Sequence, residues 1–275
     1  MNDDILALKK TMEHYYTANG RHDMPWRQPE PSGAYDPYKI LVSELMLQQT
    51  QVTRVMPKYE QFLGRFPDIG SLASAPLSEV LKLWQGLGYN RRAQYLHRTA
   101  QQVVSEYHGE LPRDVSELIR LPGVGKNTAG AIVVYSFNKP AVFIETNIRT
   151  VIIYHCFRGH NELVHDKDIE VVMAELIAMA PDVRSLYYAL MDYGTYLKQR
   201  VPSINKLSKS YVKQSAFHGS RRQLRGLVLR QLAERPRAAQ ELSLTARDER
   251  LEAVLKDLCH EGLICKRQNS YELAA

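Results

Sequence analysis

Hydrophobic residues recur at helical spacing along roughly the first 200 residues of the chain. Apolar side chains stand three or four positions apart, as in Ile40, Leu41 and Leu45, and proline or glycine interrupts the pattern at intervals. A stripe of this period is typical of helices that bury one face. The pattern therefore predicts an all-α region. We expect helices at 3–18, 37–49, 51–64, 69–74, 76–83, 90–107, 114–119, 126–136, 146–157, 166–178 and 183–197.

The pattern changes after about residue 198. Lys, Ser, Asn and Pro accumulate over 198–216 without a clear period, which predicts an exposed connector. Beyond it we expect helices at 221–233 and 247–261, then two short strands around Gln268-Asn269. Two helices and a hairpin are typical of a small winged-helix-like module. A terminal appendage or an oligomerisation segment is the alternative interpretation.

Composition places the chain among ordinary globular proteins. Its hydrophobic content of 44% is ample for a packed core. The apolar stretch 129–137 is far shorter than the ~20 residues that a membrane span needs, and the acidic start at Asp3 and Asp4 is unlike a signal peptide. We therefore expect a cytoplasmic protein that associates with the nucleoid through DNA and does not bind membranes.

The charge distribution and the cysteine content say less about partners and metal sites. Eleven basic residues and the single acid Glu234 lie between Lys198 and Arg237, although the net charge of the whole chain is only +6. Such a block fits a polyanionic partner, but a solvated face or a flexible linker explains it equally well. The three cysteines have no CxxC spacing, so we expect reduced thiols and no metal site. They are Cys156, Cys259 and Cys265.

The sharpest local motif is the run 121–126, which reads LPGVGK and precedes a helix that opens at Asn127. Two glycines one residue apart allow a sharp turn, and the amides of the turn then point outward at a helix N-terminus, where a phosphate binds well. A plain helix-turn-helix with glycine caps is the alternative. The motif favours a hairpin that grips a DNA backbone.

Five stretches together resemble the MutY branch of the helix-hairpin-helix DNA glycosylases. They are Pro25–Arg27, Asp36–Tyr38, Val42–Val52, Leu83–Tyr89 and Leu121–Gly130. The resemblance covers about residues 24–197 and implies a two-lobed α fold with an active site in the cleft between the lobes. It divides the chain into a helical lobe, a six-helix barrel with the hairpin, and the winged-helix-like module. Their expected ranges are 1–28 plus 141–215, 29–140 and 216–275.

The resemblance also implies roles for individual residues. Glu44 matches the catalytic acid, which protonates adenine because adenine leaves badly as an anion. Gln49 and Thr50 match residues at the gap left by a flipped base, and Tyr89 matches an aromatic wedge, with a core aromatic as the alternative. The full set of expected DNA contacts is Gln49, Thr50, Tyr89, Leu121, Gly123, Val124, Gly125, Lys126 and Thr128.

The chain departs from the family at three site positions. Glu145 stands where the family has an Asp that stabilises positive charge on the sugar, so it either keeps this role or marks a reshaped or inactive site. Asn127 replaces the lysine of bifunctional relatives, which leaves water as the attacking group. Tyr188 replaces the Gln or Glu that recognises adenine, which weakens the case for adenine. With Trp26 and Arg27, Asn127 and Tyr188 are expected to line the substrate pocket.

A fourth departure concerns cofactors. The family usually has four cysteines for an iron-sulfur cluster after the Gly194 region, whereas residues 194–217 contain none. We therefore expect no cluster and no other metal, and a monovalent cation at the hairpin stays open. The expected partner is double-stranded DNA with a mismatched or damaged base, bound by a monomer.

Three functional hypotheses follow from these patterns. The first is a monofunctional glycosylase that removes adenine opposite guanine or 8-oxoguanine. The second, in the same class, removes thymine or uracil from mispairs with guanine. The third belongs to another class and is a helix-hairpin-helix DNA-binding protein that has lost catalysis.

Overall fold

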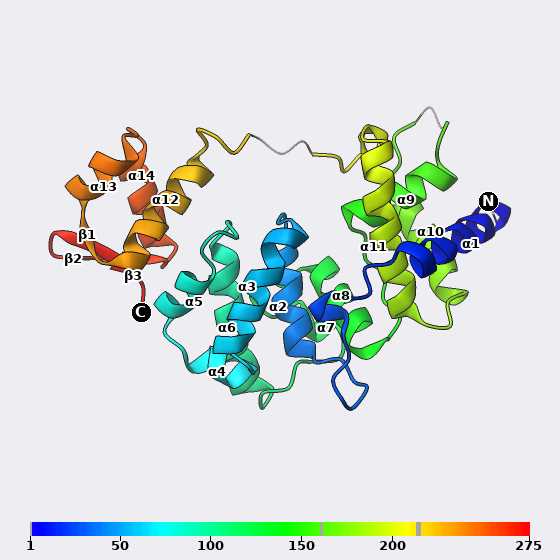
Figure 1. Cartoon of the computed structure of the whole chain (residues 1–275), viewed down its shortest axis with the longest axis horizontal. Helices are drawn as coiled ribbons and strands as arrows, with labels where there is room; N and C mark the ends of the chain where they lie inside the picture. The colour runs from blue at the N-terminus through cyan, green and yellow to red at the C-terminus, as the bar shows by residue number, and fades with distance from the viewer. Residues whose placement is uncertain (1, 160–161, 213–215) are drawn as a thin grey trace. The chain divides into compact units, whose positions relative to one another are not determined.

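The computed structural model describes residues 2–159, 162–212 and 216–275, and most of them are helical (Figure 1). The expected all-α architecture before residue 200 is confirmed, with helix ends within a few residues of those expected. The elements of this region are α1 (Asn2–Asn19), η1 (Pro25–Arg27), α2 (Pro37–Leu47), α3 (Val52–Arg65), α4 (Ile69–Ser74), α5 (Leu77–Leu83), α6 (Arg91–Glu106), α7 (Val115–Leu118), α8 (Lys126–Phe137), α9 (Thr146–Cys156), α10 (Asp166–Ala178) and α11 (Val183–Arg200). No helix among the described residues is long and apolar enough to cross a membrane.

Contacts within the chain define two units. The first unit comprises Met1–Ile40, Arg113–Ile119 and Val124–Lys213, and the second unit comprises Leu41–Pro112, Arg120–Gly123 and Gln214–Ala275. The expected division into two lobes and a module stays a prediction, and the two units group some of its elements in another way. Helix α8 groups with the first unit because it packs on α7 and α11, and the C-terminal module groups with the second because α12 (Arg221–Glu234) packs on α5. The expected boundary between 215 and 216 adjoins residues 213–215, which lie outside the described residues.

In the first unit, α11 packs closely against α9 and α1. Gly194 of α11 makes this approach feasible, because a Cβ atom there would lie 2.3 Å from the carbonyl oxygen of Asn147. Any larger residue would push the two helices apart. The packing fixes the first turn of α9 against α11, and this turn follows Glu145.

The described part of the connector after α11 is mostly exposed, as expected, but one short stretch of it is anchored to the first unit. Residues Ile204–Leu207 form a short 3-10 helix, η2, in which Ile204 and Asn205 are buried. The Asn205 amide donates to Thr150 Oγ1 of α9 at 2.9 Å, and the Val164 amide donates to the Leu207 carbonyl at 2.8 Å. Hydrogen bonds, rather than an apolar stripe, hold this segment, so its sequence shows no period.

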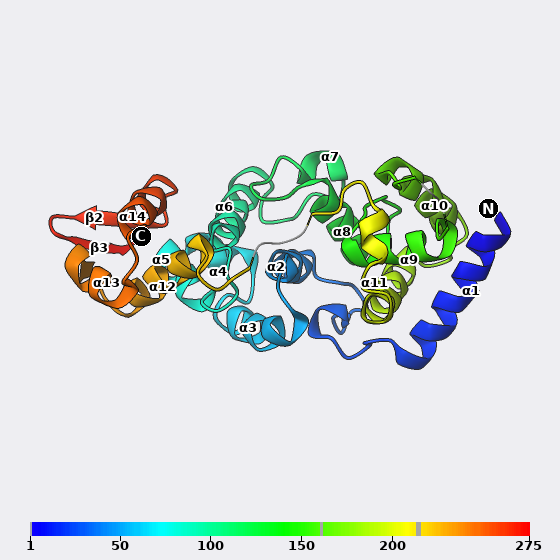
Figure 2. The same cartoon turned by 90° about the horizontal axis from the view of Figure 1, so that it is seen from above.

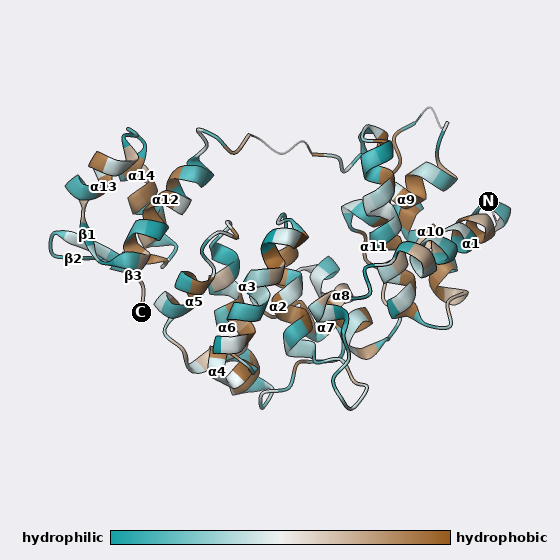
Figure 3. Ribbon diagram, in the orientation of Figure 1, coloured by the Kyte–Doolittle hydropathy of each residue, from teal (hydrophilic) through white to brown (hydrophobic). Residues whose placement is uncertain are grey.

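The second unit has a core between α3, α4, α5 and α6. Phe62, Phe66 and Trp84 are fully buried and meet edge to face around 5 to 6 Å apart. Hydrophobic and hydrophilic residues alternate along these helices, as the sequence pattern predicts (Figure 3). The core fixes the positions of the loops that follow α2 and α5.

The C-terminal module has the element order of a winged helix. After α12 come β1 (Arg237–Ala238), α13 (Ala239–Ala246), α14 (Leu251–His260), β2 (Ile264–Arg267) and β3 (Ser270–Leu273), with an antiparallel sheet in the order β1-β3-β2. Figure 2 shows β2 and β3 side by side. The expected helices and hairpin are confirmed, although the second helix begins at Leu251 and not at 247. Strand β1 and helix α13 were not expected, because two residues of strand and eight of helix are too short for a periodic signal.

Candidate functional site

Glu145 occupies the N-cap position of α9 in extended backbone conformation, with φ −106° and ψ 168°. Among the described residues its side chain makes no capping hydrogen bond, so the carboxyl group does not serve the helix end. Burial raises the pKa of Glu145 above its ordinary value. A buried carboxyl group with a raised pKa and no capping role is typical of a functional site.

Asn127 fixes the peptide that precedes Glu145. Its Nδ2 donates to the Ile144 carbonyl at 2.8 Å, and the Ile144 amide donates to its Oδ1 at 3.4 Å. A side-chain amide paired in both directions with one residue defines the orientation of that peptide. Asn127 therefore acts as a positioning residue, and its carboxamide offers no amine for a Schiff base.

Arg27, Tyr188 and Asp192 form a buried cluster in the first unit. The Arg27 guanidinium lies 4.3 Å from the centre of the Tyr188 ring, and this ring stacks on Tyr135 at 4.8 Å with an interplanar angle of 9°. Arg27 also donates to both carboxylate oxygens of Asp192, at 2.8 and 2.9 Å. Trp26, the neighbour of Arg27 in η1, is buried as well. The structure thus brings Arg27 and Tyr188 together, and their role as substrate contacts stays a prediction.

In the second unit, Glu44 lies on α2 and is half-buried, one turn before the end of the helix. That end is held by Arg92 of α6, whose Nη1 donates to the carbonyl oxygens of Met46 at 3.0 Å and Gln48 at 2.7 Å. The last carbonyl groups of a helix lack partners within the helix, so a side chain from elsewhere stabilises them. Arg92 thereby fixes the segment that carries Glu44.

Arg92 also joins two loops. Its Nη2 donates to Thr50 Oγ1 at 3.1 Å and to the Leu87 carbonyl at 3.1 Å, and Thr50 Oγ1 donates to the same carbonyl at 3.2 Å. Gln49 and Tyr89, one in each loop, adopt left-handed backbone with φ 54° and 48°. Such a conformation is costly for residues other than glycine and persists where surrounding contacts enforce it. Arg92 supplies such contacts.

Sequence reasoning missed Arg92. The available signal was its position on the apolar stripe of α6, one helical turn before buried Leu96. A charged side chain on a stripe that faces the core needs buried hydrogen-bond partners. Burial without a carboxylate lowers the pKa of Arg92 to about 10.

The hairpin has the expected form. Gly123 has φ 75°, and a Cβ atom there would lie 2.6 Å from Cβ of Tyr95, so only glycine fits this turn. Leu121 and Val124 are buried on either side of this turn. Gly125 is exposed, and DNA contact by its backbone stays a prediction. The remaining two predicted contacts, on the first turn of α8, are exposed Lys126, paired with Glu170 at 3.2 Å, and half-buried Thr128.

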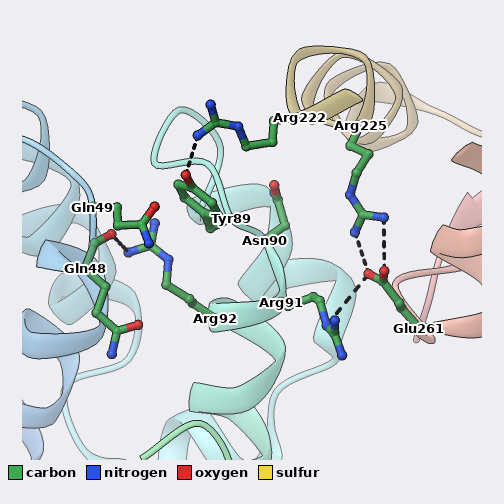
Figure 4. Close-up of a pocket in the computed structure, with 9 residues that line it drawn as sticks. All are labelled: Gln48, Gln49, Tyr89, Asn90, Arg91, Arg92, Arg222, Arg225 and Glu261. Atoms are coloured by element: carbon green, nitrogen blue, oxygen red, sulfur yellow. Dashed lines mark hydrogen bonds and ion pairs between the residues drawn. The ribbon is translucent and has the colours of Figure 1, made fainter. Parts of the chain in front are cut away.

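The second unit also contains a pocket of about 400 Å³ that includes Gln49 and Tyr89 (Figure 4). Its other lining residues are Gln48, Asn90, Arg91, Arg92, Arg222, Arg225 and Glu261. Three of these belong to the C-terminal module. Arg222 belongs to the basic block between Lys198 and Arg237, which fits a polyanionic partner. Its hydrogen bond to Tyr89, which lies 133 positions earlier, had no signal in the sequence.

The cysteines do not fit an iron-sulfur cluster, which requires four ligands as a rule. Cys156 lies in α9, and burial raises its pKa to about 11, which disfavours the thiolate form. Cys259 and Cys265 lie in the C-terminal module, in α14 and β2. The described residues contain no cluster of three or more His, Cys, Asp or Glu side chains that could hold a metal ion.

Comparison with known proteins identifies a family and several relatives of this chain. The family model described as HhH-GPD superfamily base excision DNA repair protein matches residues 42–259. An adenine DNA glycosylase of Buchnera aphidicola is 34% identical over 221 residues, which are 77% of this chain and 60% of the relative. One of Mycolicibacterium smegmatis is 38% identical over 178 residues, or 64% of this chain and 58% of the relative. The chain thus spans about 60% of the length of these curated relatives.

Solved structures show the same fold. A thermostable thymine-DNA glycosylase superposes with a TM-score of 0.62 at 26% identity, covering 76% of this chain and 97% of that one. Endonuclease III trapped on DNA superposes with a TM-score of 0.58 at 20% identity, covering 71% and 87%. The family match extends over most of the chain and includes the hairpin, Glu44 and Glu145. The chain belongs to the HhH-GPD superfamily of base excision DNA repair proteins.

Proposed function

We propose that this protein is a monofunctional DNA glycosylase that removes adenine mispaired with guanine or 8-oxoguanine. The observation that carries the proposal is the buried carboxyl group of Glu145, fixed at the start of α9 by the pairing of Asn127 with Ile144. The names of the curated relatives support adenine as the excised base. Double-stranded DNA with a mispaired base is the proposed substrate, bound by a monomer.

The proposed chemistry divides two carboxyl groups between two tasks. Glu44 donates its proton to the ring of adenine as the bond between C1′ and the base breaks, so the base leaves neutral. Ionised Glu145 stabilises the positive charge that develops on the sugar. Water then bonds to C1′ and releases a proton that restores Glu44. Asn127 forms no covalent intermediate, so the strand stays intact.

Thymine or uracil opposite guanine is a second candidate for the excised base. The likeness to a thymine-DNA glycosylase, whose chain is matched almost completely, favours it. Tyr188 favours it too, because an aromatic ring stacked on Tyr135 replaces the amide or carboxyl group expected to recognise adenine. Both candidates use the same two carboxyl groups and differ in the base.

Single-turnover assays on a panel of duplexes test this proposal. Each duplex holds adenine, thymine or uracil opposite guanine, or adenine opposite 8-oxoguanine, and is treated with alkali after incubation. We expect release of adenine, with strand breaks only after alkali. Release of thymine or uracil would select the second candidate, and binding without release from any duplex would show a DNA-binding protein without activity.

Two variants assign the roles. Glu44→Gln keeps size and hydrogen bonding but removes the proton, so we expect a rate loss on the order of 100-fold or more with little change in affinity. Glu145→Asp restores the residue that the family resemblance implies. If this variant keeps its excision rate, the site has the geometry usual in the family. If the excision rate falls sharply, the site has been rebuilt around the longer side chain of Glu145. Borohydride trapping of a covalent adduct in good yield would contradict the monofunctional assignment.

We also propose that the protein works without an iron-sulfur cluster. The support is that the chain has three cysteines, of which Cys156 has a raised pKa. Metal analysis of the purified protein should find no stoichiometric iron, and the solution should be colourless.

A further inference from the structure

The C-terminal module is attached to α6 by specific hydrogen bonds and ion pairs. Gln94 of α6 donates through Nε2 to the carbonyl oxygens of Glu261 at 2.8 Å and Gly262 at 3.1 Å. The Glu261 carboxylate accepts from Arg225 Nη1 at 3.1 Å and pairs with Arg91 of α6 at 4.0 Å. These contacts hold α12, which carries Arg225, beside the loop that follows α5 (Figure 4).

Arg222 extends from the same helix to Tyr89 in this loop (Figure 4). Its Nη1 donates a hydrogen bond to the Tyr89 hydroxyl group, and its Nη2 donates to the Ala216 carbonyl at 3.5 Å. The carbon atom of its guanidinium group lies 5.4 Å from the centre of the Tyr89 ring. The contact therefore combines a charge-assisted hydrogen bond with a cation–π interaction.

The other end of Tyr89 is held by the body of the second unit. Arg92 Nη2 donates to the carbonyl oxygens of Leu87 at 3.1 Å and Gly88 at 3.0 Å, just before Tyr89. Its guanidinium carbon lies 5.5 Å from the centre of the Tyr89 ring. The backbone of Tyr89 is thus fixed, and its ring, which is 36% exposed, projects from the loop toward the module.

The position of Arg222 conflicts with the proposed use of Tyr89. An aromatic side chain that enters a base stack does so with its far end first, and that end must then lie between bases. The far end of Tyr89 is its hydroxyl group, against which Arg222 lies. Insertion of Tyr89 into DNA and its hydrogen bond to Arg222 therefore exclude one another.

We propose that Arg222 is an autoinhibitory latch, which holds Tyr89 closed without DNA and must release it before the ring enters the duplex. The inference rests on the proposed function, because that function requires a flipped base and gives Tyr89 its place in the gap. A bond of this strength keeps the open state at about one-tenth of the molecules, so it weakens insertion-dependent binding about tenfold. Binding to intact DNA, where nothing is inserted, does not depend on the latch.

Binding to a product analogue tests the latch without any excision. One duplex carries a tetrahydrofuran abasic analogue opposite guanine, beside a 2-aminopurine whose fluorescence rises when an inserted side chain unstacks it. The second duplex is intact. We expect Arg222→Ala to bind the analogue duplex about tenfold more tightly than the unaltered full-length protein, and the intact duplex no more tightly.

Tyr89→Phe removes the other partner of the bond and keeps the ring for insertion. Because the cation–π interaction with Arg222 survives in this variant, we expect a smaller gain, about threefold, on the analogue duplex. A loss of affinity in Tyr89→Phe would show that the hydroxyl group serves the bound state and would contradict the latch.

Arg230→Ala removes an exposed arginine from the same helix and is the matched control for the lost positive charge. Melting temperatures of all variants verify folding. The latch is refuted if Arg222→Ala binds the analogue duplex no more tightly than Arg230→Ala does, or if it gains equally on intact DNA. It is refuted too if no variant raises the 2-aminopurine fluorescence, because Tyr89 then does not insert. Failure of adenine release in the panel above would leave these binding results unaffected.

Discussion

Each unit contains one buried arginine at its candidate site, and the two are stabilised in opposite ways. Burial disfavours the charge of Arg27, but hydrogen bonds and attraction from Asp192 outweigh it and raise its pKa. Arg92 has carbonyl oxygens and the hydroxyl group of Thr50 as its hydrogen-bond partners, and burial lowers its pKa to about 10. A carboxylate neutralises the first charge, whereas peptide dipoles solvate the second.

This difference indicates different roles. The pair of Arg27 and Asp192 links the N-terminal segment to α11 across 165 positions of sequence, as a structural cross-link beneath Tyr188. Arg92 instead joins the end of α2 to the loop before α6, where Gln49 and Tyr89 have strained backbone. We infer that loss of the first arrangement mainly costs stability and loss of the second mainly costs DNA binding.

The largest expected effect is that of Asp192→Asn. The substitution leaves Arg27 buried without a counter-charge, so the free energy of unfolding should fall by about 3–5 kcal/mol. Urea denaturation measures this loss. Arg21→Met is the matched control, because Arg21 pairs with the same carboxylate through a side chain that is 32% exposed. The loss of unfolding free energy in this variant should be much smaller. Equal losses would mean that burial of Arg27 is not the cause.

The same pair gives a pH signature. Burial would raise the pKa of Asp192, but its bonds to Arg27 and Arg21 lower it below the ordinary value. The stabilisation is therefore complete above the unfolded-state pKa of about 3.9 and is lost as the pH falls through the folded-state value. The stability difference between the unaltered protein and Asp192→Asn should be constant near neutrality and shrink below about pH 4.

Arg92→Met should have a smaller effect on stability. It leaves buried carbonyl groups without a donor, which costs about 1–3 kcal/mol, but it also removes a poorly compensated charge. DNA affinity should fall on the order of tenfold, because the loops with Gln49 and Tyr89 lose their common support. Fluorescence anisotropy on a mismatched duplex measures this change. Arg92→Lys keeps the charge without the fork, and full rescue by it would contradict the geometric role.

The smallest effect on stability is expected for Glu145→Gln, and it should be a stabilisation. Because burial raises the pKa of Glu145, its ionised form destabilises the folded state above the unfolded-state pKa, and the penalty grows as the pH rises through the folded-state value. The amide carries no such penalty. The variant should melt at a higher temperature than the unaltered protein at pH 7 and at an equal temperature below about pH 4, while excision is lost. A lower melting temperature at pH 7 would show that the carboxylate is stabilised by its surroundings.

The sequence by itself determined the helices of the first 200 residues, the hairpin and the helix start at Glu145. Their signals are local: an apolar stripe is read within one helix, and the glycine at position 123 reports a turn that only glycine adopts. Family membership was also evident from such local runs. The segment 201–210 gave no local signal, because its order comes from partners such as Thr150 that lie elsewhere in the chain.

Only the tertiary structure decided how the site residues are held. Arg92 reaches carbonyl groups more than 40 positions earlier, and Arg222 reaches Tyr89 from 133 positions later. Arginines occur throughout this sequence, and most of them lie at the surface. The fact that a residue is an arginine therefore does not reveal whether its side chain is solvated, paired or buried. That depends on which carbonyl, carboxylate or hydroxyl groups the packed helices bring within about 3 Å of the guanidinium. These partners exist only after distant segments have packed together.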